Sequence, residues 1–270
     1  MLADWIYNHP TWLVGGVIVA LIVAFSCAVL VVFHRLVPVR IRRAHNDVVG
    51  FCIAVTGVIY AVLLAFIAVL TWETYRKADV AVANEANYVG DVYRNTLGMP
   101  DELAGRLRGH LSQYIDVVIA HEWPDQQTGH VDERAWQEGW NILADFHSDI
   151  ARFRPANAGE AVLQGQLLRS LNGLYDARRT RLLAAGEHVT PVVWWIIGLG
   201  AAITIGFTFL FGALNIKMHL AVTGMVAASL AVVIVLIVAL DWPFRGALSV
   251  SNDAFRAVQE NMRAQTFQHR

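Results

Sequence analysis

Two acidic residues stand where long apolar runs give way to polar sequence. Glu73 directly follows one such run, and Asp241 follows another, within the segment "LDWPFRG". Repeated around the axis of an oligomer, these carboxylates would form a ring that concentrates cations at the mouth of a pore. The plainer alternative is solvation at an interface, or pairing with the nearby Arg76, Lys77 or Arg245. We therefore interpret Glu73 and Asp241 as candidates for a pore mouth.

Hydroxyl groups inside the apolar runs are the candidates for a pore lining. Thr56 and Tyr60 lie in the second run, and Thr204 and Thr208 lie in the third. Thr204 and Thr208 are four residues apart, so on a helix they share a face. The alternative is that these hydroxyls bond to a neighbouring helix or back to their own backbone.

A third group of candidates is basic. The segment "LNGLYDARRTRL" carries Arg178, Arg179 and Arg181 close to the predicted end of a helix, where cations favour the helix dipole. These side chains are candidates for contacts with anions or with lipid phosphates. The alternative is a solvated basic helix end with Asp176 as the partner.

Motifs for enzymatic chemistry are absent from the sequence. It contains no His-Glu-x-x-His pattern, no phosphate-binding loop that ends in Gly-Lys-Ser/Thr, and no Gly-x-Ser-x-Gly elbow. The net charge is −1, and no basic stripe alternates with aromatic residues. We therefore expect no enzyme, no cofactor, no metal site and no nucleic-acid partner.

The composition is that of a membrane protein. Hydrophobic residues make up 56% of the 270 residues and charged residues 16%, against about 25% charged in a soluble domain. A helix of about 20 apolar residues crosses roughly 30 Å of hydrocarbon and satisfies its own backbone. Four uncharged runs are long enough for this: Thr11–Phe33, Val48–Trp72, Thr190–Ile216 and Leu220–Leu240. Because they contain no Asp, Glu, Lys, Arg or His, they argue against an active transporter but not against a channel.

The fold class that follows is all-α, with four transmembrane spans and an extramembrane helical bundle inserted between spans two and three. The predicted division is a first hairpin (1–72, with spans at about 11–33 and 48–72), the bundle (73–188), a second hairpin (189–241) and a C-terminal tail helix (242–270). No Gly or Pro interrupts Val58–Val89, and apolar residues recur every three or four positions beyond Trp72. The second span is therefore predicted to continue as a helix into the bundle, so that movement of the bundle would be transmitted to the span.

Within the bundle, prolines and glycines predict where helices begin and end. A helix is expected to open at Pro100 and close before Pro124, and a second to stop at Pro155. A third is expected to end near Gly186, and Pro191 is expected to begin span three.

Basic residues predict the orientation in the membrane. The loop Arg35–Arg43 is strongly basic and Lys217 lies in the turn between spans three and four, so both short loops are predicted to lie inside. The termini and the bundle are then outside, in a multi-pass protein of the bacterial cytoplasmic (inner) membrane. Arginines in the C-terminal tail and at Arg178–Arg181 favour the opposite orientation.

Several segments together resemble an uncharacterised bacterial and plant membrane family labelled "bestrophin-like". The resemblance covers roughly Val48–Gln259. It is carried by "GFCIAVTGVIYAVLLAFIAVLTWETY", "EANYVGDVYR", "EW" at Glu122, "LNGLYDARRTRL", "FTFLFGALN" with His219, and "LDWPFRG". It implies an oligomeric channel, with anions as one candidate for the ion. The predicted orientation is opposite to that of true bestrophins, so no pore residue of theirs is mapped onto this chain.

Two functional hypotheses follow. The first is a homo-oligomeric ion channel or pore in the lipid bilayer, with spans two and three nearest the axis and the extramembrane helices shaping or gating it. The second is a membrane-anchored helical sensor or scaffold that binds a partner and does not conduct.

Overall fold

The structure is a computed structural model that describes residues 2–129 and 133–268, and all of its regular elements in these residues are helices. The predicted all-α fold is thereby confirmed. In chain order the helices are α1 (Leu2–Asn8), α2 (Thr11–Leu36), α3 (Val39–Arg43), α4 (Asn46–Thr96), α5 (Asp101–Val117), the π-helical turn η1 (Val118–Glu122), α6 (Trp123–Thr128), α7 (Glu133–Arg152), α8 (Ala158–Ala185), α9 (Pro191–Phe209), α10 (Ile216–Leu240) and α11 (Asp253–Gln268).

The chain divides into two compact units. We call Met1–Glu73 with His188–Asp241 and Gly246–Leu248 the membrane unit, and the remaining residues the extramembrane unit. The chain passes between the units after Glu73 and after Glu187, next to the predicted limits 72/73 and 188/189. The predicted tail, 242–270, contributes to both units, and its helix α11 belongs to the extramembrane unit.

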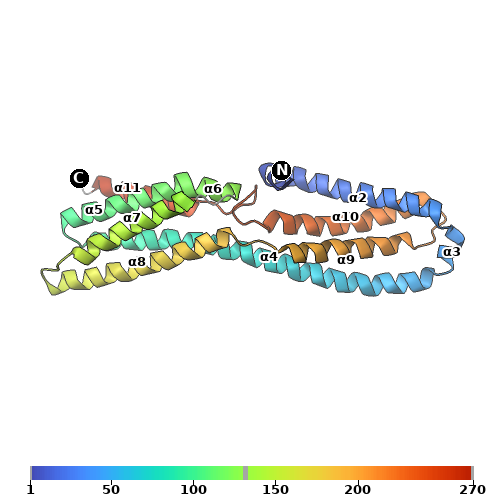
Figure 1. Cartoon of the computed structure of the whole chain (residues 1–270), viewed down its shortest axis with the longest axis horizontal. Coiled ribbons are helices and arrows are strands. Elements are labelled where there is room, and N and C mark those ends of the chain that lie inside the picture. Colours follow the sequence, from blue (N-terminus) through green and yellow to red (C-terminus); the bar gives the residue numbers. More distant parts are fainter. Residues whose placement is uncertain (1, 130–132, 269–270) are drawn as a thin grey trace. The chain divides into compact units, whose positions relative to one another are not determined.

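In the part of the chain that the structure describes, four helices are long and apolar enough to cross a membrane, namely α2, α4, α9 and α10. In the membrane unit α2 and α10 lie side by side (Figure 1). Gly15 allows this approach, because a Cβ atom there would collide with the side chain of Val235. Most of the apolar surface of the four helices remains exposed, as expected for helices that face lipid.

Side chains of the first loop hold the turn of the second hairpin. Arg42, which is buried, donates to the backbone carbonyls of Phe209 (3.1 Å) and Phe211 (3.3 Å), where α9 ends. The side-chain oxygen of Asn46 accepts the N–H of Gly212 at 2.8 Å. Carbonyls at the end of a helix lack partners within the helix, so these bonds fasten the α2–α4 connection to the α9–α10 turn.

The extramembrane unit is a helical bundle with its own apolar core. Its buried residues come from the later part of α4, from α5, α7 and α8, and from α11 with the segment that precedes it. Trp123 contacts Phe244 and Phe255 edge-on, which packs the C-terminal segment against the start of α6. Helices α5 and α7 lie next to each other (Figure 1).

The expectations for individual helices are confirmed except at Pro124. Helix α4 is unbroken from Asn46 to Thr96, and α8 ends at Ala185 with Gly186 as its cap. The predicted stop before Pro124 is wrong, since the chain stays helical from Asp101 through η1 to Thr128. The π-helical turn η1 ends directly before α6, so that Pro124 occupies the first turn of α6, where the missing N–H is not needed.

Candidate functional site

The two predicted pore-mouth carboxylates have different surroundings. Glu73 is exposed, whereas Asp241 is only 6% exposed and accepts the backbone N–H of Val189 at 2.6 Å. Burial raises the pKa of the Asp241 carboxyl, and the Val189 N–H, His188 and Trp194 partly oppose that rise. Asp241 thus ties the end of α10 to the segment that leads into α9.

Three of the four predicted pore-lining hydroxyls are used inside the membrane unit. Tyr60 donates to the carbonyl of Ile197 at 2.6 Å. Thr204 and Thr208 donate back to carbonyls of their own helix at 2.8 and 2.6 Å. This bonding is the alternative that the sequence left open for these positions. Thr56 is half-buried, and its place in a pore lining stays a prediction.

Tyr60 fixes one face of α4 against α9. A Cβ atom at Gly200 would collide with the Tyr60 ring, so the glycine makes room for the aromatic side chain. The ring is buried together with Leu64, Ile67 and Ile197. This face of α4 is therefore directed at its neighbour in the same chain.

The opposite face of α4 carries an exposed stripe that was not among the candidates predicted from the sequence. Its residues follow one another at intervals of three or four, which keeps them on one side of a helix. All of them are exposed, and we call them the α4 stripe: Phe51, Val55, Val58, Val62, Phe66, Val69 and Glu73. Glu73 continues the register of the apolar residues and closes the stripe with a negative charge. The regular spacing of large apolar residues is the signal in the sequence from which the α4 stripe could have been predicted.

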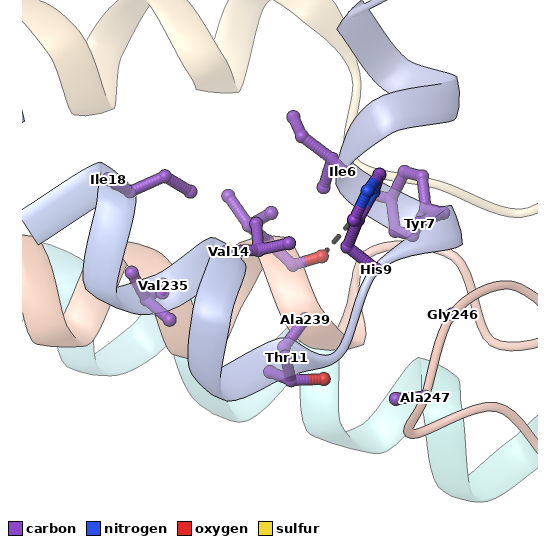
Figure 2. Close-up of a pocket in the computed structure, with 12 residues that line it drawn as sticks. Ile6, Tyr7, His9, Thr11, Val14, Ile18, Val235, Ala239, Gly246 and Ala247 are labelled. Carbon is purple, nitrogen blue, oxygen red and sulfur yellow. Dashed lines mark hydrogen bonds between the residues drawn. The ribbon is translucent and has the colours of Figure 1, made fainter.

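Two hollows lie elsewhere in the membrane unit. A groove of about 520 Å³ is lined by apolar side chains of α2, α9 and α10 and by Ser26, whose hydroxyl donates to the carbonyl of Ile22 at 2.7 Å. A pocket of about 20 Å³ lies where α1 meets α2 and α10, close to Tyr7 and His9 (Figure 2). Space of this size accommodates about one water molecule.

The three predicted basic candidates lie in different environments. Arg179 is exposed and pairs with Asp176 at 3.2 Å. Arg178 and Arg181 are 0% exposed and bind carboxylates of distant segments. Contacts of these arginines with anions or lipid phosphates remain a prediction.

Arg178 and Arg181 belong to a set of five fully buried polar residues that we call the buried charge cluster: Glu85, Tyr114, Glu122, Arg178 and Arg181. Arg181 donates to Glu85 through Nε (2.6 Å) and Nη2 (3.1 Å), and to Glu122 through Nη2 (2.7 Å). Arg178 donates to both oxygens of Glu122, at 2.6 and 3.1 Å. Tyr114 donates to Glu85 and accepts a bond from Arg178 at 3.2 Å.

The charges of the cluster balance, with two carboxylates against two guanidinium groups. Burial by itself lowers the pKa of Arg178 and Arg181, but the adjacent acidic groups outweigh it and both pKa values are raised. Burial, reinforced by the charge of Glu85, raises the pKa of the Tyr114 hydroxyl well above its usual value. Both arginines therefore stay charged, and the Tyr114 hydroxyl stays protonated, around neutral pH.

The register of α8 explains why its two arginines reach the buried charge cluster. Arg178 and Arg181 follow Leu171 and Leu174 on the buried face of α8, at the spacing of a helical face. Glu85 comes from α4 and Glu122 from the π-helical turn. The register of the arginines with the buried leucines was a signal in the sequence that these side chains point inward, while their acidic partners were not identifiable from it.

Comparison with known proteins assigns the fold and the family. A family model described as "Bestrophin-like domain" matches residues 20–255, which is most of the chain. The chain belongs to the Bestrophin-like domain family. The predicted resemblance is thereby confirmed, and with its four apolar helices the bestrophin-like chain is a multi-pass membrane protein. Among curated proteins, none matches it.

Solved structures share the fold of this bestrophin-like chain at low sequence identity. A crystal structure of a bacterial Bestrophin homolog from Klebsiella pneumoniae, phased with zinc, is 15% identical with a TM-score of 0.66, over 92% of this chain and 99% of that one. A variant of that homolog with a leucine replaced by threonine gives a TM-score of 0.68 at 15% identity, over 90% and 98%. A crystal structure described only as a membrane protein, with a leucine replaced by alanine, gives 0.66 at 14% identity, over 88% and 96%.

Proposed function

We propose that this chain forms a homo-oligomeric ion channel, with the α4 stripe facing the central axis and Glu73 at its mouth. The observation that carries the proposal is the register of the stripe, in which six apolar side chains and one carboxylate share one exposed face of a membrane-crossing helix. An apolar constriction can gate ion flow by losing its water. A ring of carboxylates at the mouth of a pore concentrates cations there. Bacterial Bestrophin homologues with the same fold support this choice.

The face of α4 that carries Tyr60, opposite the α4 stripe, is consistent with this arrangement. Tyr60 and its apolar neighbours bind α9 of the same chain, so that face is not free for a pore. The stripe is the face of α4 that the membrane unit leaves uncovered. Spans two and three would then lie nearest the axis, with α9 behind α4.

The extramembrane helices are proposed to shape or gate the pore through α4. This helix belongs to both units and has no break between them. Its extramembrane part is held at Glu85 by the buried charge cluster. A displacement of the bundle would thus reach the stripe through continuous helical backbone.

Ion flux from liposomes that contain the purified full chain tests the proposal. Protein-containing vesicles are expected to release ions faster than empty vesicles, and Val62→Ser is expected to change the rate by making the constriction polar. Val32→Ser is the matched control, because Val32 is an exposed valine on α2, outside the stripe. No flux in any salt would refute the channel and leave the membrane-anchored scaffold. Equal effects of the two variants would refute the assignment of the stripe to the pore.

A further inference from the structure

A strongly basic surface in the membrane unit has no role in the proposed pore. It is formed by side chains from the last turn of α2, from α3 and from the first turn of α10, and all of them are exposed. We call it the basic rim: Arg35, Arg40, Arg43 and Lys217.

The bonds between the two hairpin loops place the cations of α3 and Lys217 at the same end of the membrane unit. Arg42 lies between Arg40 and Arg43 in sequence, but it points inward to the carbonyls of Phe209 and Phe211. The backbone of Arg43 lies so close to Gly212 that a Cβ atom on the glycine would collide with it. The α3 arginines are thus fixed beside the α9–α10 connection, and Lys217 follows this connection at the start of α10.

Among the described residues, the charge of the rim is not balanced by an ion-pair partner. None of its four side chains forms an ion pair with another residue that the structure describes. Asp47 is the one acidic residue in the segments 34–47 and 210–219. Elsewhere exposed arginines do have acidic partners, as Arg106 and Arg179 show.

The rim must lie at the level of the lipid headgroups, because it is attached to the ends of helices that cross the membrane. Large apolar side chains are exposed among the cations, with Leu36 at 74%, Ile41 at 58% and Leu214 at 76%. In segments that combine such apolar side chains with arginines, the apolar side chains insert into the acyl region and the arginines point to the headgroups.

We propose that the basic rim binds the phosphate groups of anionic phospholipids in the leaflet that it faces. A guanidinium group matches a phosphate with two parallel N–H···O bonds, and three of the four rim cations are arginines. Basic clusters directly next to membrane-crossing helices attract anionic lipid. This binding does not depend on ion conduction, so the inference goes beyond the proposed channel.

Native mass spectrometry of the full chain, released from nanodiscs with equal parts of phosphatidylglycerol and phosphatidylcholine, tests the inference. The wild type is expected to retain phosphatidylglycerol in preference, and removal of each rim cation is expected to lower that preference about fivefold. The test variant is Arg35→Gln, Arg40→Gln, Arg43→Gln and Lys217→Gln combined. The control removes the same charge from exposed arginines of the extramembrane unit: Arg152→Gln, Arg154→Gln, Arg169→Gln and Arg263→Gln.

The outcomes distinguish bound lipid from bound free anions and from no binding. Equal retention of the two lipids by the wild type, or an unchanged preference in the rim variant, would overturn the inference and leave the rim as a signal for orientation. Displacement of the lipid by excess inorganic phosphate would assign the rim to free anions and likewise overturn it. If the rim variant does not fold, the salt dependence of the wild type tests the inference instead. Raising the salt concentration from about 0.1 M to 1 M shortens the Debye length from roughly 10 Å to 3 Å, and the preference for phosphatidylglycerol should then be abolished. Lipid retention is measured without ion flux, so its failure would leave the channel proposal untouched.

Discussion

Glu85→Gln removes one negative charge from the buried charge cluster and preserves the size of the side chain. Both carboxylate oxygens of Glu85 accept bonds from Arg181, at 2.6 and 3.1 Å, and Tyr114 donates to one of them. With glutamine in this place, two buried guanidinium groups share the single carboxylate of Glu122. Breaking a fully buried charge pair in this way costs about 3–5 kcal/mol. We expect the extramembrane unit to lose stability by that amount.

The matched control is Glu102→Gln. Glu102 accepts a bond from Arg106 at 2.9 Å, four residues along α5, with side chains 91% and 51% exposed. Exposed pairs of this kind contribute about 0–1 kcal/mol, since water and salt screen them. The two variants make the same chemical change to a carboxylate and differ in burial.

Hydrogen exchange of the full chain, measured on peptides from α4 and α8 beyond Glu73, reports the local free energy of opening. A loss of about 3–5 kcal/mol corresponds to exchange faster by about two to four orders of magnitude. The double variant Glu85→Gln/Arg181→Met restores the charge balance and is expected to recover part of the loss. If Glu85→Gln accelerates exchange no more than Glu102→Gln, the reasoning that the cluster is dry and dependent on its charge balance is refuted.

Three further predictions follow from single contacts. Gly139→Ala places a Cβ atom against Arg178 and is expected to cost about 1–3 kcal/mol, whereas Gly109→Ala, with open space around it, should be neutral or stabilising by thermal unfolding. Tyr60→Phe removes a buried hydrogen bond between helices and should cost about 0.6 kcal/mol, seen as a small drop of the melting temperature in detergent. Because burial raises the pKa of Asp241, its contribution to stability is complete below the ordinary Asp pKa of about 3.9 and is lost as the pH rises through the raised value. Asp241→Asn should remove that pH dependence of the melting temperature, and an unchanged profile would contradict it.

The spans and the long helix could be predicted because their physical causes are local. A charge in hydrocarbon is costly, so uncharged runs mark the four membrane-crossing helices, and the structure has a helix at each. Helix α4 continues beyond Trp72 because nothing in its sequence interrupts the hydrogen-bonded backbone. The stop predicted at Pro124 is wrong because Pro124 lies in the first turn of α6, where proline is tolerated. The sequence alone does not distinguish such a proline from one that ends the preceding helix.

The buried charge cluster could not be predicted because its partners are distant in sequence. Arg181 pairs with Glu85, which is 96 residues away, and Arg178 pairs with Glu122, which is 56 away. Local composition favours a solvated basic helix end, which describes Arg179, whereas contacts with distant segments bury Arg178 and Arg181. For Asp241, too, the sequence shows a carboxylate at a helix end but not the Val189 N–H that it accepts.

The unbroken backbone of α4 also constrains which insertions and deletions this protein can accept during evolution. Tyr60 and Glu85, each of which is bonded to another helix, are 25 residues apart in α4, close to seven turns. Inserting or deleting one residue between them would rotate one anchor by about 100° relative to the other. Relatives of this chain should therefore vary in length in the connections between helices, and should tolerate changes in α4 mainly in steps of seven or eleven residues, which restore the phase of the helix.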